Sequence, residues 1–290
     1  MKIRVGSRES RLAVIQSEII INKLKMLDPS VETELVTMKT TGDKILDRTL
    51  DKVGGKGLFV RELDRALLDG EVDITVHSLK DMPMEPEPGL KIAAYSEREA
   101  ANDVLILRRG ETELKGAIGC ASLRRGEQLK RLYPGIEIKP IRGNVITRLN
   151  KLDSGEYGAI VLAKAGIVRL GLCDRISREF TAEEIIPAAG QGIMAVETRE
   201  DYYNELLERI NDENAQCCAV AERSFVRALG GGCSIPVAAY AQTDGIGMTV
   251  CGMDARSGEL ISCVIRGYAE DAEQLGIQLA DGVRRESMMH

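Results

Sequence analysis

The chain opens with a strand pattern, a helix pattern and a second strand pattern, and this order restricts its fold class. Residues 2–5 are typical of a strand, residues 6–10 of a turn, and apolar side chains then recur at helical spacing over about residues 11–26. Ser10 is placed to cap that helix, and alternating polar and apolar residues predict a strand over Glu32–Met38. A strand–helix–strand unit favours a mainly parallel sheet, so the sequence predicts an α/β fold.

Similar patterns continue up to the glycine-rich segment at residues 229–236. The expected strands are 73–77, Leu90–Tyr95, 104–107, 117–119, 136–140 and Ala159–Ala163, and the expected helices are 59–68, 122–132, 145–152, 164–170, 202–210 and 215–229. Residues 40–57 are expected to form a long polar loop, and residues 185–192 a crossover or hinge. The pattern then changes to three strands and a helix, which indicates a separate small α+β module. These elements are expected at Val237–Thr243, 248–254, 260–268 and about 271–284.

Composition excludes several classes of protein. The net charge of −6 disfavours a general nucleic-acid-binding surface, and no apolar run approaches membrane-spanning length. The N-terminus enters a strand pattern without a signal peptide, so we expect a cytoplasmic protein with reduced thiols. The 7 cysteines match no zinc spacing, and the 2 histidines, His77 and His290, disfavour a Ser-His-Asp triad or a His-rich metal site. No metal is therefore expected.

Arginines recur at the expected strand-to-helix turns, mostly beside glycine or serine. Each one alone is typical of a solvated surface charge, but seven together can line one cleft. A guanidinium pairs with carboxylates and stays charged when partly buried. Arg124 and Arg125 are expected in the first turn of a helix capped by Ser122, beside free backbone N–H groups. In an acidic chain this pattern indicates a basic pocket for a small polyanion. The set comprises Arg8, Arg11, Arg124, Arg125, Arg142, Arg148 and Arg169.

Two side chains outside this set are candidates for chemistry. Cys233 follows three glycines and stands three residues before Pro236, so the sequence predicts a thiol on a bare, tight loop after a helix. Such a cysteine is either a small buried apolar side chain or a thiol that carries a covalent group. Asp81, at the end of an expected buried strand, either caps the turn before Pro83 or stabilises a developing cation. His77, inside that strand, is expected to be structural.

Several segments, in order along the chain, resemble the porphobilinogen deaminase (hydroxymethylbilane synthase) family. The resemblance covers residues from about 3 to 240, and the last fifty residues add little to it. Several ordered motifs are more specific than any one of them. The segments are His77-Ser78-Leu79-Lys80-Asp81-Met82-Pro83, Val53-Gly54-Gly55-Lys56-Gly57-Leu58-Phe59, Ser122-Leu123-Arg124-Arg125, Arg142-Gly143-Asn144-Val145, Pro187-Ala188-Ala189-Gly190-Gln191-Gly192 and Gly231-Gly232-Cys233.

The resemblance implies an enzyme that joins four porphobilinogen molecules head to tail, releases ammonia at each addition and frees hydroxymethylbilane with water. It implies a dipyrromethane cofactor, made from substrate and attached to Cys233 by a thioether. It also implies that the Asp81 carboxylate is catalytic, contacting pyrrole nitrogens and stabilising an azafulvene cation. The implied cofactor-binding residues are Cys233, Lys80, Asp81, Ser122, Arg124 and Arg125, and the implied substrate-binding residues are Arg8, Arg11, Gln16, Phe59, Arg142, Arg148 and Arg169.

The resemblance further implies a monomer of three domains. Two would be similar to type II periplasmic binding proteins, with the chain crossing between them twice, and the third would be a small α+β domain. The implied bounds are 1–97 with 191–213 for the first, 98–190 for the second and 214–290 for the third. One departure is Cys120-Ala121, which stands where a hydroxyl-bearing pair is common, so these two residues supply no hydroxyl for a carboxylate.

Two functions from other classes stay open beside this one. The first is a non-catalytic, anion-binding module with the same two-lobed architecture. The second is a thiol-dependent enzyme that resolves its covalent intermediate at every turnover.

Overall fold

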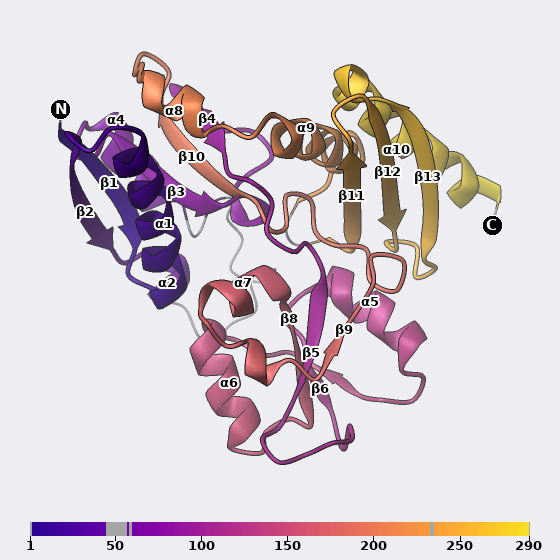
Figure 1. Cartoon of the computed structure of the whole chain (residues 1–290). Helices are drawn as coiled ribbons and strands as arrows, with labels where there is room; N and C mark the ends of the chain where they lie inside the picture. Colours follow the sequence, from indigo (N-terminus) through magenta and orange to yellow (C-terminus); the bar gives the residue numbers. More distant parts are fainter. Residues whose placement is uncertain (1, 45–56, 58–59, 233–234, 290) are drawn as a thin grey trace.

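The computed structural model describes residues 2–44, 57, 60–232 and 235–289. These residues form three units, each built on its own sheet (Figure 1). The first and second sheets have five strands each, and the third has three. Two α/β units joined by a double crossover and a small α+β unit are therefore present, which confirms the expected fold class. Among the described residues, no helix combines the length and apolar composition that crossing a membrane requires.

The first unit has the strand order β2-β1-β3-β10-β4, with β1 parallel to β2 and β3 and with β10 antiparallel to its two neighbours. Ser10 caps α1 as predicted, and Leu24 of this helix shares a core with Ile3 of β1. The elements are β1 (Lys2–Arg8), α1 (Arg11–Leu27), β2 (Glu32–Met38), α2 (Thr41–Lys44), α4 (Arg61–Leu68), β3 (Ile74–Ser78), the 3-10 turn η1 (Leu79–Asp81), β4 (Leu90–Tyr95), β10 (Met194–Arg199) and α8 (Glu205–Ile210).

Three details of this unit differ from the sequence prediction. The expected turn at residues 6–10 is wrong at its start, because β1 stays paired with β2 as far as Arg8, opposite Met38. The expected loop at 40–57 begins with the short helix α2. The strand β10 was not predicted at all, because Glu197 and Thr198 place polar side chains in a strand whose first five residues are buried.

The second unit has the strand order β7-β6-β8-β5-β9, with β6 parallel to β7 and β8, and β5 antiparallel to β8. In both sheets the strand that follows a crossover, β10 in the first and β5 in the second, is inserted next to an edge strand. The elements are β5 (Asp103–Leu107), β6 (Ile118–Gly119), α5 (Leu123–Leu132), β7 (Ile138–Lys139), α6 (Val145–Asp153), β8 (Ala159–Ala163), α7 (Lys164–Arg169), the 3-10 turn η2 (Cys173–Arg175) and β9 (Arg178–Glu179).

The third unit packs two helices against an antiparallel sheet of order β11-β12-β13. Its core places Phe225 of α9 and Leu279 of α10 against Val250 of β12. The elements are α9 (Glu213–Ala228), β11 (Val237–Thr243), β12 (Gly247–Asp254), β13 (Ile261–Tyr268), the 3-10 turn η3 (Ala269–Asp271) and α10 (Ala272–Met289). The predicted strands and helices of this unit are confirmed within a few residues, apart from α10, which extends further toward the C-terminus.

The two crossovers between the first and second units run side by side. The backbone N–H of Ser96 donates to the carbonyl of Met194 at 2.8 Å, and that of Glu99 donates to the carbonyl of Gly192 at 3.2 Å. Gly192 has φ +92°, and a Cβ atom there would lie 2.1 Å from the Glu99 carbonyl oxygen. Only glycine therefore allows the two crossovers to approach this closely.

A buried ion pair joins both crossovers to the third unit. Arg98, in the first crossover, donates through Nη2 to both carboxylate oxygens of Glu222 on α9, each at 2.7 Å. The same carboxylate accepts the backbone N–H groups of Gly190, in the second crossover, at 2.6 Å and of Ala241, on β11, at 2.8 Å. Burial raises the pKa of Glu222, and Arg98 opposes that shift.

We predict that Arg98→Ala destabilises the chain by about 3–5 kcal/mol, because it leaves the Glu222 carboxylate buried without its cation. The measurement is the free energy of unfolding by urea denaturation. The matched control is Arg108→Ala, whose partly exposed pair with Glu111 should contribute less than about 1 kcal/mol. Equal losses in the two variants would contradict the importance assigned to the Arg98–Glu222 pair.

Candidate active site

A cavity of about 590 Å³ lies where the three units meet. The first unit contributes the ends of β1 and β3, the second the N-terminal ends of α5 and α6, and the third Gly232 and the start of β11. The cavity is electropositive in a chain of net charge −6. Among its described lining residues, the basic ones are Arg8, Lys39, Lys80, Arg124, Arg125, Arg142, Arg148 and Arg169, and the acidic ones are Glu9 and Asp81.

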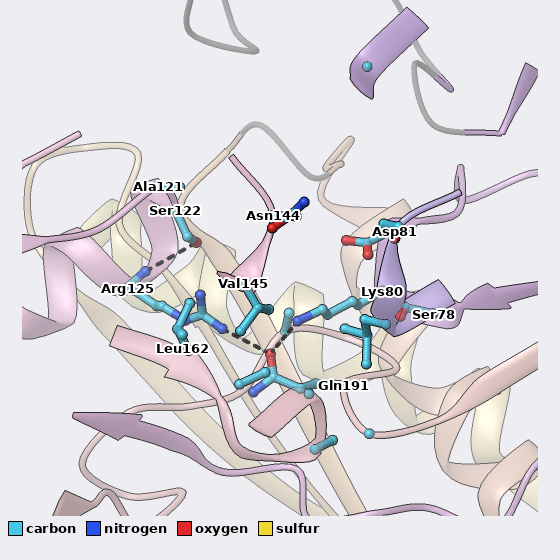
Figure 2. A pocket seen from close by; sticks show the side chains of 18 of the residues that line it. Ser78, Lys80, Asp81, Ala121, Ser122, Arg125, Asn144, Val145, Leu162 and Gln191 are labelled. Atoms are coloured by element: carbon cyan, nitrogen blue, oxygen red, sulfur yellow. Dashed lines mark hydrogen bonds between the residues drawn. The ribbon is translucent and has the colours of Figure 1, made fainter. Parts of the chain in front are cut away.

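Asp81 lies at the end of η1, the turn that follows β3. Its side chain is exposed to solvent and lines the cavity beside Lys80 (Figure 2). The turn is held from the third unit by Arg223 on α9, whose Nη2 donates to the carbonyl oxygens of Pro83 and Met84, the latter at 2.9 Å. The position of the Asp81 carboxylate thus depends on contacts that cross between two units.

The ammonium group of Lys80 has a lowered pKa. Its Nζ lies 3.5 Å from Oε1 of Gln191, which reaches the cavity from the second crossover (Figure 2). Burial lowers the pKa of Lys80 to about 8; Asp81 partly opposes this shift and Arg125 reinforces it. The ammonium group is therefore charged at neutral pH but sensitive to small changes in its surroundings.

Asp103, on β5, bridges the two arginines at the start of α5. Its carboxylate accepts hydrogen bonds from Nη2 of Arg124 at 2.9 Å, from Nη2 of Arg125 at 2.7 Å and from Nε2 of Gln191 at 2.7 Å. Burial alone would raise the pKa of Asp103, but the two arginines outweigh it and hold that pKa well below its ordinary range. Arg124 also donates to the carbonyl of Ile186 at 2.6 Å, so both of its terminal nitrogens have protein acceptors.

Arg125 retains a donor that no described residue accepts. Ser122 caps α5 as predicted, because its Oγ accepts the backbone N–H of Arg125 at 3.4 Å (Figure 2). The Nε atom of Arg125 is buried and has no hydrogen-bond partner among the described residues. A buried donor of this kind is costly unless a partner binds it.

Three more predicted arginines line the same cavity, namely Arg142, Arg148 and Arg169. Burial lowers the pKa of Arg148 to about 10, reinforced by Arg125 and Arg142 nearby. Arg148 donates through Nε to the carbonyl of Gly143 at 2.7 Å, which orients its guanidinium. Arg169 donates through Nη2 to the carbonyl of Gly192 at 2.6 Å and so links α7 to the second crossover.

The remaining predicted residues have different outcomes. Arg8 and Gln16 line the cavity, and Gln16 donates through Nε2 to the hydroxyl of Ser78 at 2.9 Å. Arg11 is exposed in the first turn of α1 and is not among the residues that line the cavity, so the structure does not bring it to the others. Cys233 and Phe59 lie outside the described residues, although Gly232 and Ile235 both line the cavity.

Sequence reasoning missed two residues at the centre of this arrangement, Gln191 and Asp103. Gln191 lies inside the Gly190-Gln191-Gly192 motif, in which the two glycines are the more distinctive residues. Asp103 begins a buried strand, and a charge at such a position requires a partner, so the sequence signals a buried ion pair without identifying Arg124 and Arg125. Ala121 also lines the cavity and supplies no hydroxyl there, as its side chain implies.

Two family models match the chain. One is the dipyrromethane cofactor binding domain of porphobilinogen deaminase, over residues 3–206, and the other is the C-terminal domain of the same enzyme, over residues 216–284. The chain belongs to the porphobilinogen deaminase family. The porphobilinogen deaminase of Acetivibrio thermocellus is 55% identical and covers 97% of both chains. That of Alkaliphilus oremlandii is 52% identical over 100% of this chain and 99% of its own. That of Neisseria meningitidis serogroup B is 44% identical over 98% of this chain and 95% of its own.

Two solved structures are also similar to the chain, at much lower identity. The periplasmic VFT2 domain of BvgS from Bordetella pertussis is 15% identical, with a TM-score of 0.42 over 69% of this chain and 82% of its own. A putative sulfonate-binding protein, SsuA from Methylobacillus flagellatus, is 14% identical, with a TM-score of 0.42 over 76% and 68%.

The porphobilinogen deaminase family models divide the chain in the same way as its cavity. The dipyrromethane cofactor binding domain spans Asp81 and every arginine that lines the cavity, and the C-terminal domain begins in α9 and contains Cys233. Residues from both matched regions therefore face one space.

We predict that Asp103→Asn destabilises the chain by about 3–5 kcal/mol at neutral pH, because Arg124 and Arg125 then lose their buried carboxylate. Asp103 has a lowered pKa in the folded state, so its contribution is present above the unfolded value of about 4 and is lost as the pH falls through the folded value. Urea denaturation at several pH values is the measurement. Glu111→Gln, on a partly exposed ion pair, is the control. A difference from wild type that disappears already at pH 6 would contradict this account.

Proposed function

We propose that this chain joins four porphobilinogen molecules head to tail, with release of ammonia at each addition, and yields hydroxymethylbilane. The observation that carries the proposal is the exposed carboxylate of Asp81 on η1, beside Lys80, in a cavity lined by arginines from two units. Each porphobilinogen carries an acetate and a propionate group, and guanidinium groups pair with carboxylates in a fixed geometry. Membership of the porphobilinogen deaminase family supports the same reaction.

The described residues fit a dipyrromethane, the cofactor for which the family domain is named. The donor set consists of basic side chains that suit its carboxylates, and Arg125 holds a buried Nε donor without a partner among the described residues. Residues Lys80, Ser122, Arg124 and Arg125 would bind it. A thioether at Cys233 would anchor it, and support for this attachment comes from Gly232 and Ile235, both of which line the cavity. When bound, the dipyrromethane supplies the primer to which pyrrole units are added.

The protein side chains would divide the work by charge. Arg8, Arg142, Arg148 and Arg169 would bind substrate carboxylates and fix the orientation of the ring. Arg11 and Phe59, implied by the family resemblance, would assist from outside the described cavity lining. The Asp81 carboxylate would accept hydrogen bonds from pyrrole N–H groups and stabilise the azafulvene cation that remains when the substrate loses its amino group. Lys80, charged below pH 8, can donate to a carboxylate beside it.

We also infer that the enzyme works in the cytoplasm as a monomer, without nucleic acid. Support comes from the cysteines in the described part of the chain, which are free thiols, and from the predicted arginines, most of which line a cavity instead of an open surface.

The attachment predicts that the purified chain carries a permanent mass excess of two linked pyrrole units, which Cys233→Ser abolishes. Intact mass spectrometry measures it, and the same sample under native conditions reports the oligomeric state. The control is Cys173→Ser, an exposed thiol on η2. An unmodified chain with full activity would overturn the anchor, and a mass excess that appears only during turnover would favour the thiol-dependent enzyme. No modification together with no turnover would favour the anion-binding module.

The role of Asp81 predicts that Asp81→Asn lowers kcat by at least about 100-fold, because the developing cation loses its counter-charge. The exposed position of the side chain predicts an unchanged melting temperature. Steady-state kinetics and thermal melts are measured together, with Asp69→Asn, at the exposed end of α4, as the control. Turnover within about twofold of wild type would rule out the assigned role.

A further inference from the structure

Three titratable side chains that the proposed reaction does not use meet inside the first unit. They are Asp64 on α4, His77 on β3 and Glu197 on β10, and one ligand atom from each lies within 4.8 Å of the other two. Their exposed fractions are 8%, 5% and 2%. Glu197 is far from Asp64 and His77 in the sequence, so the three residues do not form a short motif with metal-ligand spacing.

The strand register explains how they come together. In the antiparallel pair of β3 and β10, His77 lies opposite Ala195 and Thr75 lies opposite Glu197. Residues two apart on a strand share a face of the sheet, so His77, Thr75 and Glu197 lie on one face as direct and diagonal neighbours. The helix α4 packs on both strands and brings Asp64 to the same place.

The polar atoms of this cluster are incompletely satisfied. Oε2 of Glu197 and Oδ1 of Asp64 are buried without a hydrogen-bond partner among the described residues. The unpartnered oxygen of Glu197 faces Nε2 of His77 at 3.4 Å, and the hydroxyl of Thr75 lies 2.9 Å from the same nitrogen. Burial, followed by the charge of Glu197, raises the pKa of Asp64 to about 8. The negative charge on one carboxyl group therefore disfavours ionisation of the other.

We propose that Asp64, His77 and Glu197 form a binding site for one divalent transition-metal cation of the zinc class. One imidazole nitrogen and two carboxylate oxygens are ligands that such ions accept, with a fourth position left for another oxygen. With metal–ligand bonds of about 2.0–2.2 Å, two ligands of a tetrahedral site are about 3.4 Å apart. The separation of Nε2 and Oε2 already matches this spacing. A bound cation would also neutralise the two buried carboxylates.

The cation would be structural. It would join α4, β3 and β10, and β3 runs directly into the turn that presents Lys80 and Asp81. The ion would therefore stiffen the frame behind that turn without contact with the substrate. The inference is independent of the proposed function, because no step of pyrrole joining passes through these three residues.

The test is a titration of the full-length chain with Co²⁺ after chelator treatment, followed by absorption spectroscopy and metal analysis. We expect one Co²⁺ per chain, with the absorption of nitrogen and oxygen ligation. Because the chain has 7 cysteines, a sulfur-to-cobalt charge-transfer band identifies binding elsewhere. Glu197→Gln and Asp64→Asn should each weaken binding at least about tenfold. Asp69→Asn, on the same helix but exposed, should not.

The outcomes separate the occupants. Failure of the wild-type chain to bind Co²⁺ overturns the site whatever the variants do, and indicates that the two carboxyl groups share a proton instead. Binding with a thiolate spectrum, or equal binding by wild type and both cluster variants, overturns it as well. Because the readout is metal binding and not turnover, these results leave the proposed reaction unaffected.

Discussion

The buried carboxylate of Asp103 is the charge on which the candidate site depends. Without it, the guanidinium groups of Arg124 and Arg125 would lie side by side in a region that excludes water, and their repulsion would be large. With it, both are held at 2.7–2.9 Å from a fixed anion, and Gln191 extends the network to Lys80. The cavity lining still has more basic than acidic side chains. Burial, reinforced by nearby cations, also lowers the pKa of Lys80 and of Arg148. A ligand rich in carboxylates would relieve this excess of positive charge, so the site is organised in advance for an anion.

The second constraint is the junction of the three units, whose residues together line one cavity. Two consecutive residues of α9 make different contacts at this junction. Glu222 binds Arg98 and Gly190, one in each crossover, whereas Arg223 binds the backbone carbonyls behind Asp81. Neighbouring side chains on a helix point about 100° apart, so one turn of α9 can reach both places. The third unit is thus part of the frame that positions the carboxylate of the first unit.

The fold could be predicted from the sequence wherever one pattern dominates a segment. The strand Glu32–Met38, the helix capped by Ser10 and the three strands of the third unit follow from periodicity and turn residues. The strand β10 could not, because the buried Glu197 and Thr198 remove the apolar signal that marks a central strand. The same is true of the site. The arginines are recognisable as a set, but Asp103 and Gln191 acquire their meaning only when the crossovers bring β5, α5 and the second connection together. Contacts between distant segments leave no local pattern to detect.

The cavity contains both arginines and the carboxylate of Asp81. In the proposed reaction, this arrangement would let one site orient the substrate and also stabilise the positive charge that develops on it. The arginines of the second unit line the cavity, and the exposed carboxylate of Asp81 comes from the first unit. In Figure 2, Asp81 and Arg125 lie on opposite sides of the view. In the proposed reaction, the ring carries carboxylates on one edge and a nitrogen that becomes positive on another. Only one orientation places its carboxylates beside the arginines and this nitrogen beside Asp81. The interactions with its carboxylates would already be present in the ground state of this proposed reaction and would fix its position. The interaction with Asp81 would grow as positive charge develops, so it would contribute mainly to the transition state. Because the arginines of α5 and α6 and the Asp81 carboxylate come from different units, the crossovers that fix their separation are part of the proposed chemistry as well.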